Sequence, residues 1–151
     1  MEDQDKKVEL AKNGMQEQWT RWEPIEGLAR EYYIDSIIDN RDGLEIILFD
    51  PSDKTKKLRV FFRDGASSYR NINESYVDQS LTDLEKSLGT RKRGGGTLFK
   101  VVNSRYLKTL SEESRTLTDD MGFIHFCFLL GDNMLDVVDR FDPEVSFINL
   151  S

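Results

Sequence analysis

The chain has 151 residues and a formal net charge of −7 at pH 7, so it is long enough for one domain that folds without disulfides or metal ions. Its acidity disfavours binding to nucleic acids or to an anionic membrane, because both need a basic surface. Cys127 is the only cysteine, and no apolar run approaches the roughly 18 residues that cross a membrane, so we expect a cytoplasmic protein.

The first 14 residues are polar and lack the apolar core of a signal peptide. We expect a flexible segment over residues 1–14 and a single domain over residues 15–151. Trp19 and Trp22 lie three residues apart, which would place them on one face of a short helix. Pro24 would then end that helix, because the residue before a proline avoids helical geometry.

A series of strands is predicted in the first half of the chain. β-Branched and alternating apolar residues favour strands, and they occur over residues 32–39, 44–49, 57–63 and 66–72. Asp42-Gly43 is a hairpin signal between the first two strands. Connections this short allow only antiparallel pairing, so the sequence predicts a meander of three or four strands.

A helix is predicted next, followed by a basic loop. Apolar residues recur at helical spacing at Val77, Leu81, Leu84 and Leu88. Gly89 ends this pattern, and Ser75 with Asp78 resembles a capping box. Residues 90–96 carry three basic residues and three glycines, which is more typical of a flexible connection than of a phosphate-binding loop, because a strand follows and not a helix.

The remaining third predicts alternating strands and helices. We expect strands over residues 97–102, 123–130 and 144–148. Asn103 or Ser104 would cap a short helix, residues 111–121 would form a loop or irregular helix, and a last helix would run from Asp132 or Asn133 to Phe141. Together these elements predict an α+β domain with a mainly antiparallel sheet of about five to six strands, packed by two to three helices.

The sequence offers little for catalysis. His125 is the only histidine, and on a strand it would share a face with Cys127, but two packed core residues are the simpler interpretation. One histidine and one cysteine do not form a zinc site of common spacing. Asp132, Asp136 and Asp139 would share a helical face, which indicates an acidic stripe more than a cation site. We therefore expect no enzyme activity, no metal and no cofactor.

Acidic side chains offer contacts for a basic protein partner instead. Aromatic residues of the N-terminal third lie among carboxylates, an arrangement that suits a binding hot spot as well as core packing. The candidate contact residues are Glu23, Glu26, Glu31, Asp35, Asp132, Asp136 and Asp139. The sequence does not predict an oligomeric state.

Several segments, in this order, resemble one family of small proteins from Gram-positive bacteria. The resemblance covers roughly residues 19–148. It is carried by WEPIEGL at 22–28, IDNRDGLEIIL at 38–48, SYRNINES at 68–75 and FKVVNSRYL at 99–107, and by shorter matches at 60–62, 124–126, 136–138 and 143–145. Some members of this family are encoded beside secreted polymorphic toxins of the LXG type and act as immunity proteins.

The resemblance implies a function in binding. The chain would bind the toxic C-terminal domain of a cognate toxin, often a nuclease, and block its active site or its access to substrate. Carboxylates that imitate phosphate would favour fast association with a basic nuclease site. A non-catalytic adaptor or regulator with another protein partner is the alternative, and an enzyme that uses His125, Cys127 or the group of Asp132, Asp136 and Asp139 is the least favoured one.

Overall fold

The computed structural model describes residues 16–89, 97–114 and 122–149 of the chain. The predicted flexible segment over 1–14 and the glycine loop over 90–96 lie outside these residues. Within them the α+β class is confirmed, but the strands form two antiparallel sheets of five and four strands where one sheet was predicted. No helix among the described residues is long and apolar enough to cross a membrane.

The five-stranded sheet has its strands in the order β1-β6-β7-β8-β5. Its members are β1 (Gln18–Arg21), β6 (Leu98–Val102), β7 (Ile124–Leu130), β8 (Asn133–Asp139) and β5 (Ser68–Asn73). The four-stranded sheet has the order β2-β3-β4-β9. It consists of β2 (Tyr33–Asn40), β3 (Gly43–Asp50), β4 (Asp53–Arg63) and β9 (Glu144–Asn149).

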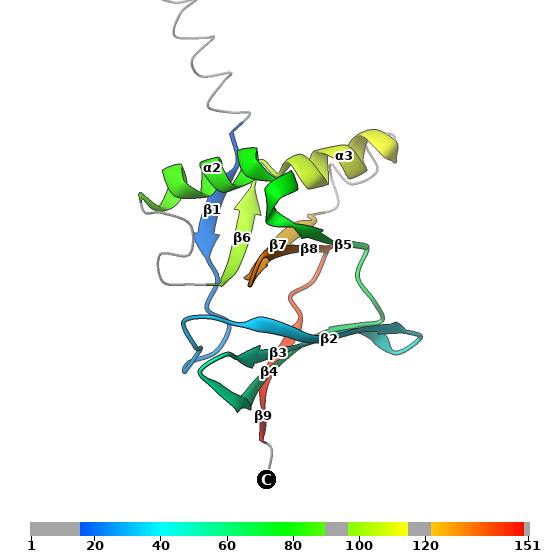
Figure 1. Cartoon of the computed structure of the whole chain (residues 1–151). Coiled ribbons are helices and arrows are strands. Elements are labelled where there is room, and N and C mark those ends of the chain that lie inside the picture. Colours follow the sequence, from blue (N-terminus) through cyan, green and yellow to red (C-terminus); the bar gives the residue numbers. More distant parts are fainter. Residues whose placement is uncertain (1–15, 90–96, 115–121, 150–151) are drawn as a thin grey trace, which may run out of the picture.

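Helices cover one side of the five-stranded sheet, and the four-stranded sheet lies on the other side (Figure 1). The helical elements are η1 (Glu74–Tyr76), α2 (Asp78–Leu88) and α3 (Arg105–Glu113). The five-stranded sheet is therefore the middle of three layers. Its central strand β7 is buried on both faces, which explains the unbroken apolar run that predicted it.

Two apolar clusters fill the spaces between the layers. The larger cluster lies between the sheets, where Phe126 and Phe128 of β7 meet Phe62 of β4. The smaller cluster joins α2 to the opposite face of β7 through Leu84 and Cys127. Adjacent residues of β7 thus serve different clusters, as the alternation of side chains along a strand requires.

The predicted helix after Asp132 is wrong, because residues 133–139 form β8. Leu135 and Val137 face the inter-sheet cluster, while Met134 belongs to the cluster under α2. A strand that is buried on both faces loses the polar–apolar alternation by which strands are recognised. The aspartates of this segment consequently do not form a helical stripe.

The predicted helix around the two tryptophans is also wrong where the structure describes it, because residues 18–21 form β1. Trp19 packs edge to face on Phe99 in the cluster under α2, whereas Trp22 packs on Phe126 between the sheets. The spacing of three residues therefore places the two rings on opposite sides of the sheet, not on one face.

The meander β2-β3-β4 is confirmed, but the fourth predicted strand leaves it, since β5 pairs with β8 in the other sheet. The helix over 78–88 is confirmed and ends at Gly89 in the left-handed conformation. Its predicted capping box is wrong, because Ser75 lies in η1 and no side chain caps α2. The Ser104 cap of α3 is confirmed.

The hairpin between β2 and β3 forms as predicted, but Gly43 has a different role from the expected turn residue. Asn40 pairs with Gly43, so the two-residue turn consists of Arg41 and Asp42. Gly43 has a φ of +146°, and a Cβ there would lie 2.3 Å from the carbonyl oxygen of Phe62. Close approach of β4 therefore requires glycine at this position.

We expect Gly43→Ala to lower the free energy of unfolding by at least about 3 kcal/mol, because the added methyl group meets backbone that cannot move aside. Urea unfolding followed by circular dichroism measures the loss. Gly89→Ala is the matched control: its φ is also positive, but nothing lies within 4 Å of the new Cβ. The control should lose about 1 kcal/mol, and equal losses in both variants would contradict the steric argument.

Candidate functional site

A buried carboxylate lies at the centre of the helix-covered face of the five-stranded sheet. Asp136 of β8 has a side chain that is 1% exposed, and it accepts hydrogen bonds from Arg70 of β5 at 3.0 and 2.9 Å. Its other oxygen lies 2.6 Å from Nε2 of His125 on β7. One carboxylate therefore links three neighbouring strands.

The network continues from His125 to the first turn of α3. Nδ1 of His125 lies 2.6 Å from Oγ of Ser104, and that oxygen also accepts the backbone N–H of Leu107. The Ser104 hydroxyl and the Asp136 carboxylate therefore hold the two ring nitrogens of His125, one on each side. Both carboxylate oxygens of Asp136, both ring nitrogens of His125 and the hydroxyl of Ser104 thus have partners, as buried polar groups require.

The side chain of Asp136 is ionised because of its partners. Burial opposes the charge and by itself raises the pKa of Asp136, but the hydrogen bond from His125 and the charge of Arg70 outweigh it. The net result is a pKa below the ordinary value. Arg70 also stacks on the ring of Tyr106, with 4.4 Å between the guanidinium carbon and the ring centroid, so the same ion pair holds α3 against the sheet.

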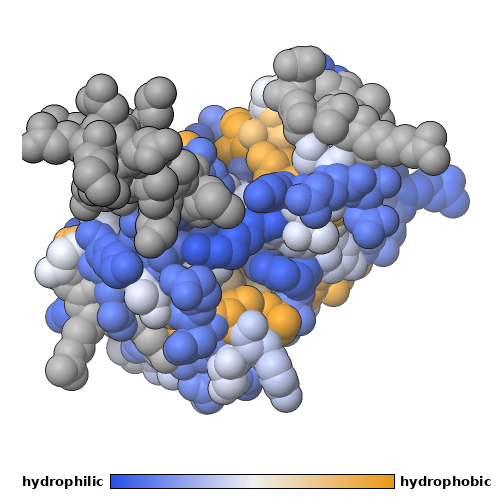
Figure 2. Space-filling view, turned by 90° about the horizontal axis from the view of Figure 1, so that it is seen from above, coloured by the Kyte–Doolittle hydropathy of each residue, from blue (hydrophilic) through white to orange (hydrophobic). Residues whose placement is uncertain are grey.

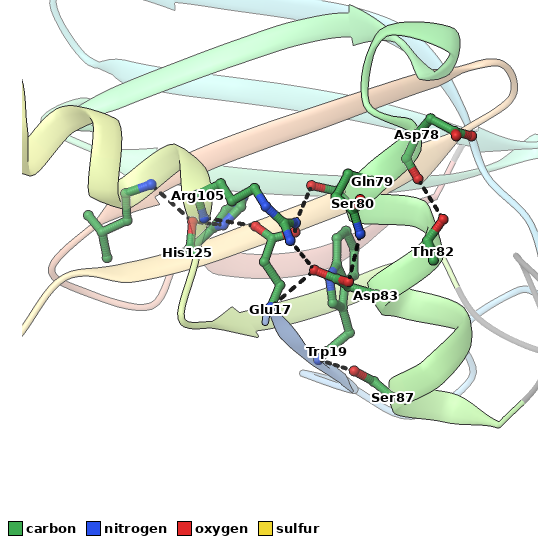
Figure 3. Close-up of polar contacts among 12 residues, drawn as sticks. Glu17, Trp19, Asp78, Gln79, Ser80, Thr82, Asp83, Ser87, Arg105 and His125 are labelled. Atoms are coloured by element: carbon green, nitrogen blue, oxygen red, sulfur yellow. Dashed lines mark hydrogen bonds and ion pairs between the residues drawn. The ribbon is translucent and has the colours of Figure 1, made fainter. Parts of the chain in front are cut away.

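A second ionic network begins one residue further along the chain. Arg105 bonds Glu17 at 2.9 Å and Asp83 of α2 at 2.5 Å, and both of these carboxylates are 2% exposed (Figure 3). Glu17 also accepts the backbone N–H of Arg105 at 2.9 Å, at the positive end of α3. Arg105 therefore joins the segment that leads into β1 to α2 and to α3.

The chemistry of these buried groups favours a structural role. The hydrogen-bonded series of Ser104, His125 and Asp136 contains the residue types of a hydrolase triad, but the ring is reversed, with Nδ1 toward Ser104 and Nε2 toward Asp136. Ser104 is also only 6% exposed, and its oxygen caps a helix. His125, Cys127 and Asp136 bring three possible metal-ligating atoms within 4.8 Å of one another. Arg70 already neutralises Asp136, so a divalent cation held by a carboxylate and a thiolate would leave an uncompensated positive charge in the core.

Exposed acidic groups gather instead on the connection between the sheets. We call residues 23–31 the acidic loop, because Glu23, Glu26 and Glu31 are all exposed on it. Buried aromatic residues flank it: Trp22 is 9% exposed and Tyr32 is 3% exposed. The hydroxyl of Tyr32 also accepts the backbone N–H of Ala29 at 3.0 Å, so both ends of the loop are held in place.

Surface hollows border the acidic loop. One, of about 570 Å³, lies between the loop and the β3–β4 turn, and it is lined by Leu28, Ala29, Arg30, Glu31, Asp50, Pro51 and Ser52. A smaller one lies between the loop and β6. The opposite, helix-covered side is mostly hydrophilic, and apolar surface is confined there to small patches (Figure 2).

The structure divides the predicted contact residues into two groups. Glu23, Glu26 and Glu31 share one loop, and Asp35 follows in β2, where it pairs with Lys57 at 2.8 Å. The other three predicted residues lie along β8. Asp132 is exposed in the turn before it, Asp136 is buried in its middle, and Asp139 is half-buried at its far end, roughly 20 Å from the turn.

Asp136 is thus not available on the surface, and the three aspartates do not form one patch. The sequence analysis missed the buried pairs of Arg70 with Asp136 and of Glu17 with Arg105. A signal for the first pair was present, because a charged residue inside the apolar run 134–138 needs a buried partner. Nothing in the sequence indicated which arginine that partner would be.

Comparisons with protein-family models, with curated proteins and with solved structures found no match.

We expect Asp136→Asn to lower the free energy of unfolding at pH 7 by about 3–5 kcal/mol, because it leaves Arg70 without its counter-charge. Since the folded-state pKa of Asp136 lies below its ordinary value of 3.8, the stabilisation is complete above that pH and is lost as the pH falls further. Urea unfolding at pH 7 and in steps below pH 4 measures both effects.

The Asp136→Asn variant should not show this loss of stability at low pH, because it has no carboxylate at position 136 that could be protonated. Asp142→Asn serves as the control, because Asp142 is 61% exposed in its pair with Lys100 and should change stability by no more than about 0.5 kcal/mol. Equal stability of wild type and Asp136→Asn at pH 7 would disprove the proposed role of the buried carboxylate.

We expect Cys127 to be unreactive in the folded protein. Burial raises the pKa of its thiol well above the ordinary value, and the nearby Asp136 carboxylate raises it further. Labelling by a maleimide at pH 8 should be at least about 100-fold slower than in concentrated urea. Cys127→Ala combined with Glu85→Cys gives an exposed control thiol, and labelling of native Cys127 at the control's rate would contradict the prediction.

Proposed function

We propose that the chain is a cytoplasmic immunity protein, which binds the toxic domain of a cognate secreted toxin and neutralises it. The acidic loop would form part of the contact surface. The observation that carries this proposal is the placement of Glu23, Glu26 and Glu31 on a loop whose flanking aromatic residues are buried. The resemblance of residues 19–148 to immunity proteins supplies the class of partner.

A loop whose ends are already fixed in the free protein suits tight binding. Segments that are already ordered lose little conformational entropy on association, so more of the contact energy appears as affinity. The acidic loop is held at its ends by the buried rings of Trp22 and Tyr32 and by the hydrogen bond that Ala29 donates to the Tyr32 hydroxyl. Its carboxylates are exposed at the rim, where charge mainly accelerates encounter with an oppositely charged partner.

The chemistry of the loop fits a basic partner, and a nuclease is the most suitable one. A nuclease site binds phosphates through lysine and arginine side chains, and exposed carboxylates compete for those groups. The hollow between the acidic loop and residues 50–52 would receive a side chain of the partner. Inhibition would then result from occlusion and would need no catalytic group in this chain.

We expect co-expression of the chain with the toxin domain encoded beside it to give a stable complex and to protect the host cell. Glu23→Lys combined with Glu26→Lys should raise the dissociation constant of the complex at least about tenfold, mainly through a slower association rate. Surface plasmon resonance measures both rate constants, and the effect should shrink at high salt.

The matched control is Glu85→Lys combined with Glu112→Lys, because it makes the same change in net charge at exposed positions of α2 and α3. If the loop variant binds as well as this control does, the acidic loop is not the contact surface. Failure of the wild-type chain either to bind or to protect would reject the immunity function, and capture of a different protein would favour the adaptor alternative.

A further inference from the structure

A hollow of about 600 Å³ lies where the acidic loop, the end of β3, the beginning of β4 and the strand β9 meet. Its lining includes Leu28, Tyr32, Asp50, Lys56 and Phe147. It adjoins the hollow beside residues 50–52, and the two share Asp50 and part of the loop. Sites for small molecules usually measure about 300–1,000 Å³, so this volume admits a small ligand.

A buried hydroxyl in the lining of this hollow has a hydrogen to donate. Tyr32 is only 3% exposed, and its oxygen accepts the backbone N–H of Ala29 at 3.0 Å. Among the residues that the structure describes, none accepts the hydrogen of the Tyr32 hydroxyl. Burial raises the pKa of Tyr32, and the charge of Asp50 raises it further, so the phenol keeps its proton at neutral pH. A buried donor without an acceptor is uncommon, and here it marks a place for a ligand atom.

Two opposite charges line the same hollow, and each has unused binding capacity. One oxygen of Asp50 accepts hydrogen bonds from the backbone N–H and the hydroxyl of Ser52, at 2.9 and 2.7 Å. The other oxygen of Asp50 and the ammonium group of Lys56 form no hydrogen bond or ion pair within the described part of the chain. Neighbouring Lys57, by contrast, is paired with Asp35 at 2.8 Å. The hollow therefore offers one anion and one cation that the fold does not use.

Apolar side chains complete the lining. Phe147 lies opposite Leu58 of β4, and Lys56 lies two residues before Leu58, so the side chains of Phe147 and Lys56 leave the same face of the sheet. The ring of Phe147 is 43% exposed. Leu28 contributes to the hollow from the acidic loop. An apolar surface thus lies beside the two charges and the buried hydroxyl.

We propose that this hollow binds a free α-amino acid with an apolar side chain. Lys56 and the Tyr32 hydroxyl donate hydrogen bonds to the carboxylate of the ligand, and the unused oxygen of Asp50 accepts one from its ammonium group. The apolar side chain of the ligand packs on Phe147 and Leu28. A simple anion would be repelled by Asp50 and a simple cation by Lys56, whereas a zwitterion satisfies both. This site goes beyond the proposed contact surface.

Titration of the isotope-labelled full chain with L-phenylalanine, followed by two-dimensional NMR, tests the proposal. We expect saturable shifts of backbone amides in residues 27–32 and 50–57, with a dissociation constant on the order of 1 mM for so small a ligand. Two ligands of similar size separate the charges: phenylpropionate lacks the ammonium group, and phenethylamine lacks the carboxylate. Each should bind at least about threefold more weakly than L-phenylalanine, because each loses one charge contact.

Variants of the two charged residues test the same contacts from the side of the protein. Asp50→Asn and Lys56→Gln should each raise the dissociation constant for L-phenylalanine at least about threefold. Asp53→Asn and Lys54→Gln are the matched controls. Asp53 likewise accepts two hydrogen bonds, in this case from Thr55, and neither control residue lines the hollow. Both controls should bind L-phenylalanine as the wild type does.

Three results would overturn the proposal. The first is the absence of saturable shifts at concentrations about tenfold above the expected dissociation constant. The second is a dissociation constant for Asp50→Asn or Lys56→Gln equal to that of its control, and the third is binding of phenylpropionate or phenethylamine as tight as that of L-phenylalanine. Circular dichroism checks that every variant folds. The toxin takes no part in these titrations, so the proposed immunity function can stand or fall separately.

Discussion

The helix-covered half of the molecule depends on two adjacent residues at the start of α3. Ser104 connects the helix to His125 and, through it, to the ion pair of Asp136 with Arg70. Arg105 connects the same turn to the buried carboxylates of Glu17 and Asp83. α3 is short and only partly buried, so its position cannot come from apolar packing alone. Directed polar contacts fix it, and they also hold α2 and the segment leading into β1.

The sequence predicted the local structure of most segments, but it failed where the residues of a strand also fit helical spacing. β2, β3 and β4 are joined by short turns and are rich in β-branched or alternating apolar residues, and all three were predicted. β8 was assigned as a helix because Met134, Leu135, Val137 and Val138 also fit helical spacing, and burial of both faces of the strand removes the period-2 signal that would have decided against it. The same error made Asp136 resemble a surface residue, because its partner Arg70 is distant in sequence and comes close only through strand pairing.

The candidate site was predictable from sequence only where its residues are close together along the chain. The acidic residues of the loop lie close together in sequence and remain close in space, so the cluster of Glu23, Glu26 and Glu31 needed no tertiary information. The hollow beside the loop joins it to the β3–β4 turn, which depends on how the two sheets stack. The opposite directions of Trp19 and Trp22 likewise depend on whether their segment is a strand or a helix. Contacts between layers are therefore what the sequence left undetermined.

The late position of β9 in the chain has a consequence for folding. The strand β4 is eleven residues long and carries the apolar side chains Leu58, Val60 and Phe62, yet its second neighbour arrives only after both α-helices and four strands of the other sheet. Closing so long a loop is slow, and until it closes β4 is an open apolar edge. The partly folded chain is thus most prone to aggregate at β4, a strand whose edges are both paired in the folded molecule.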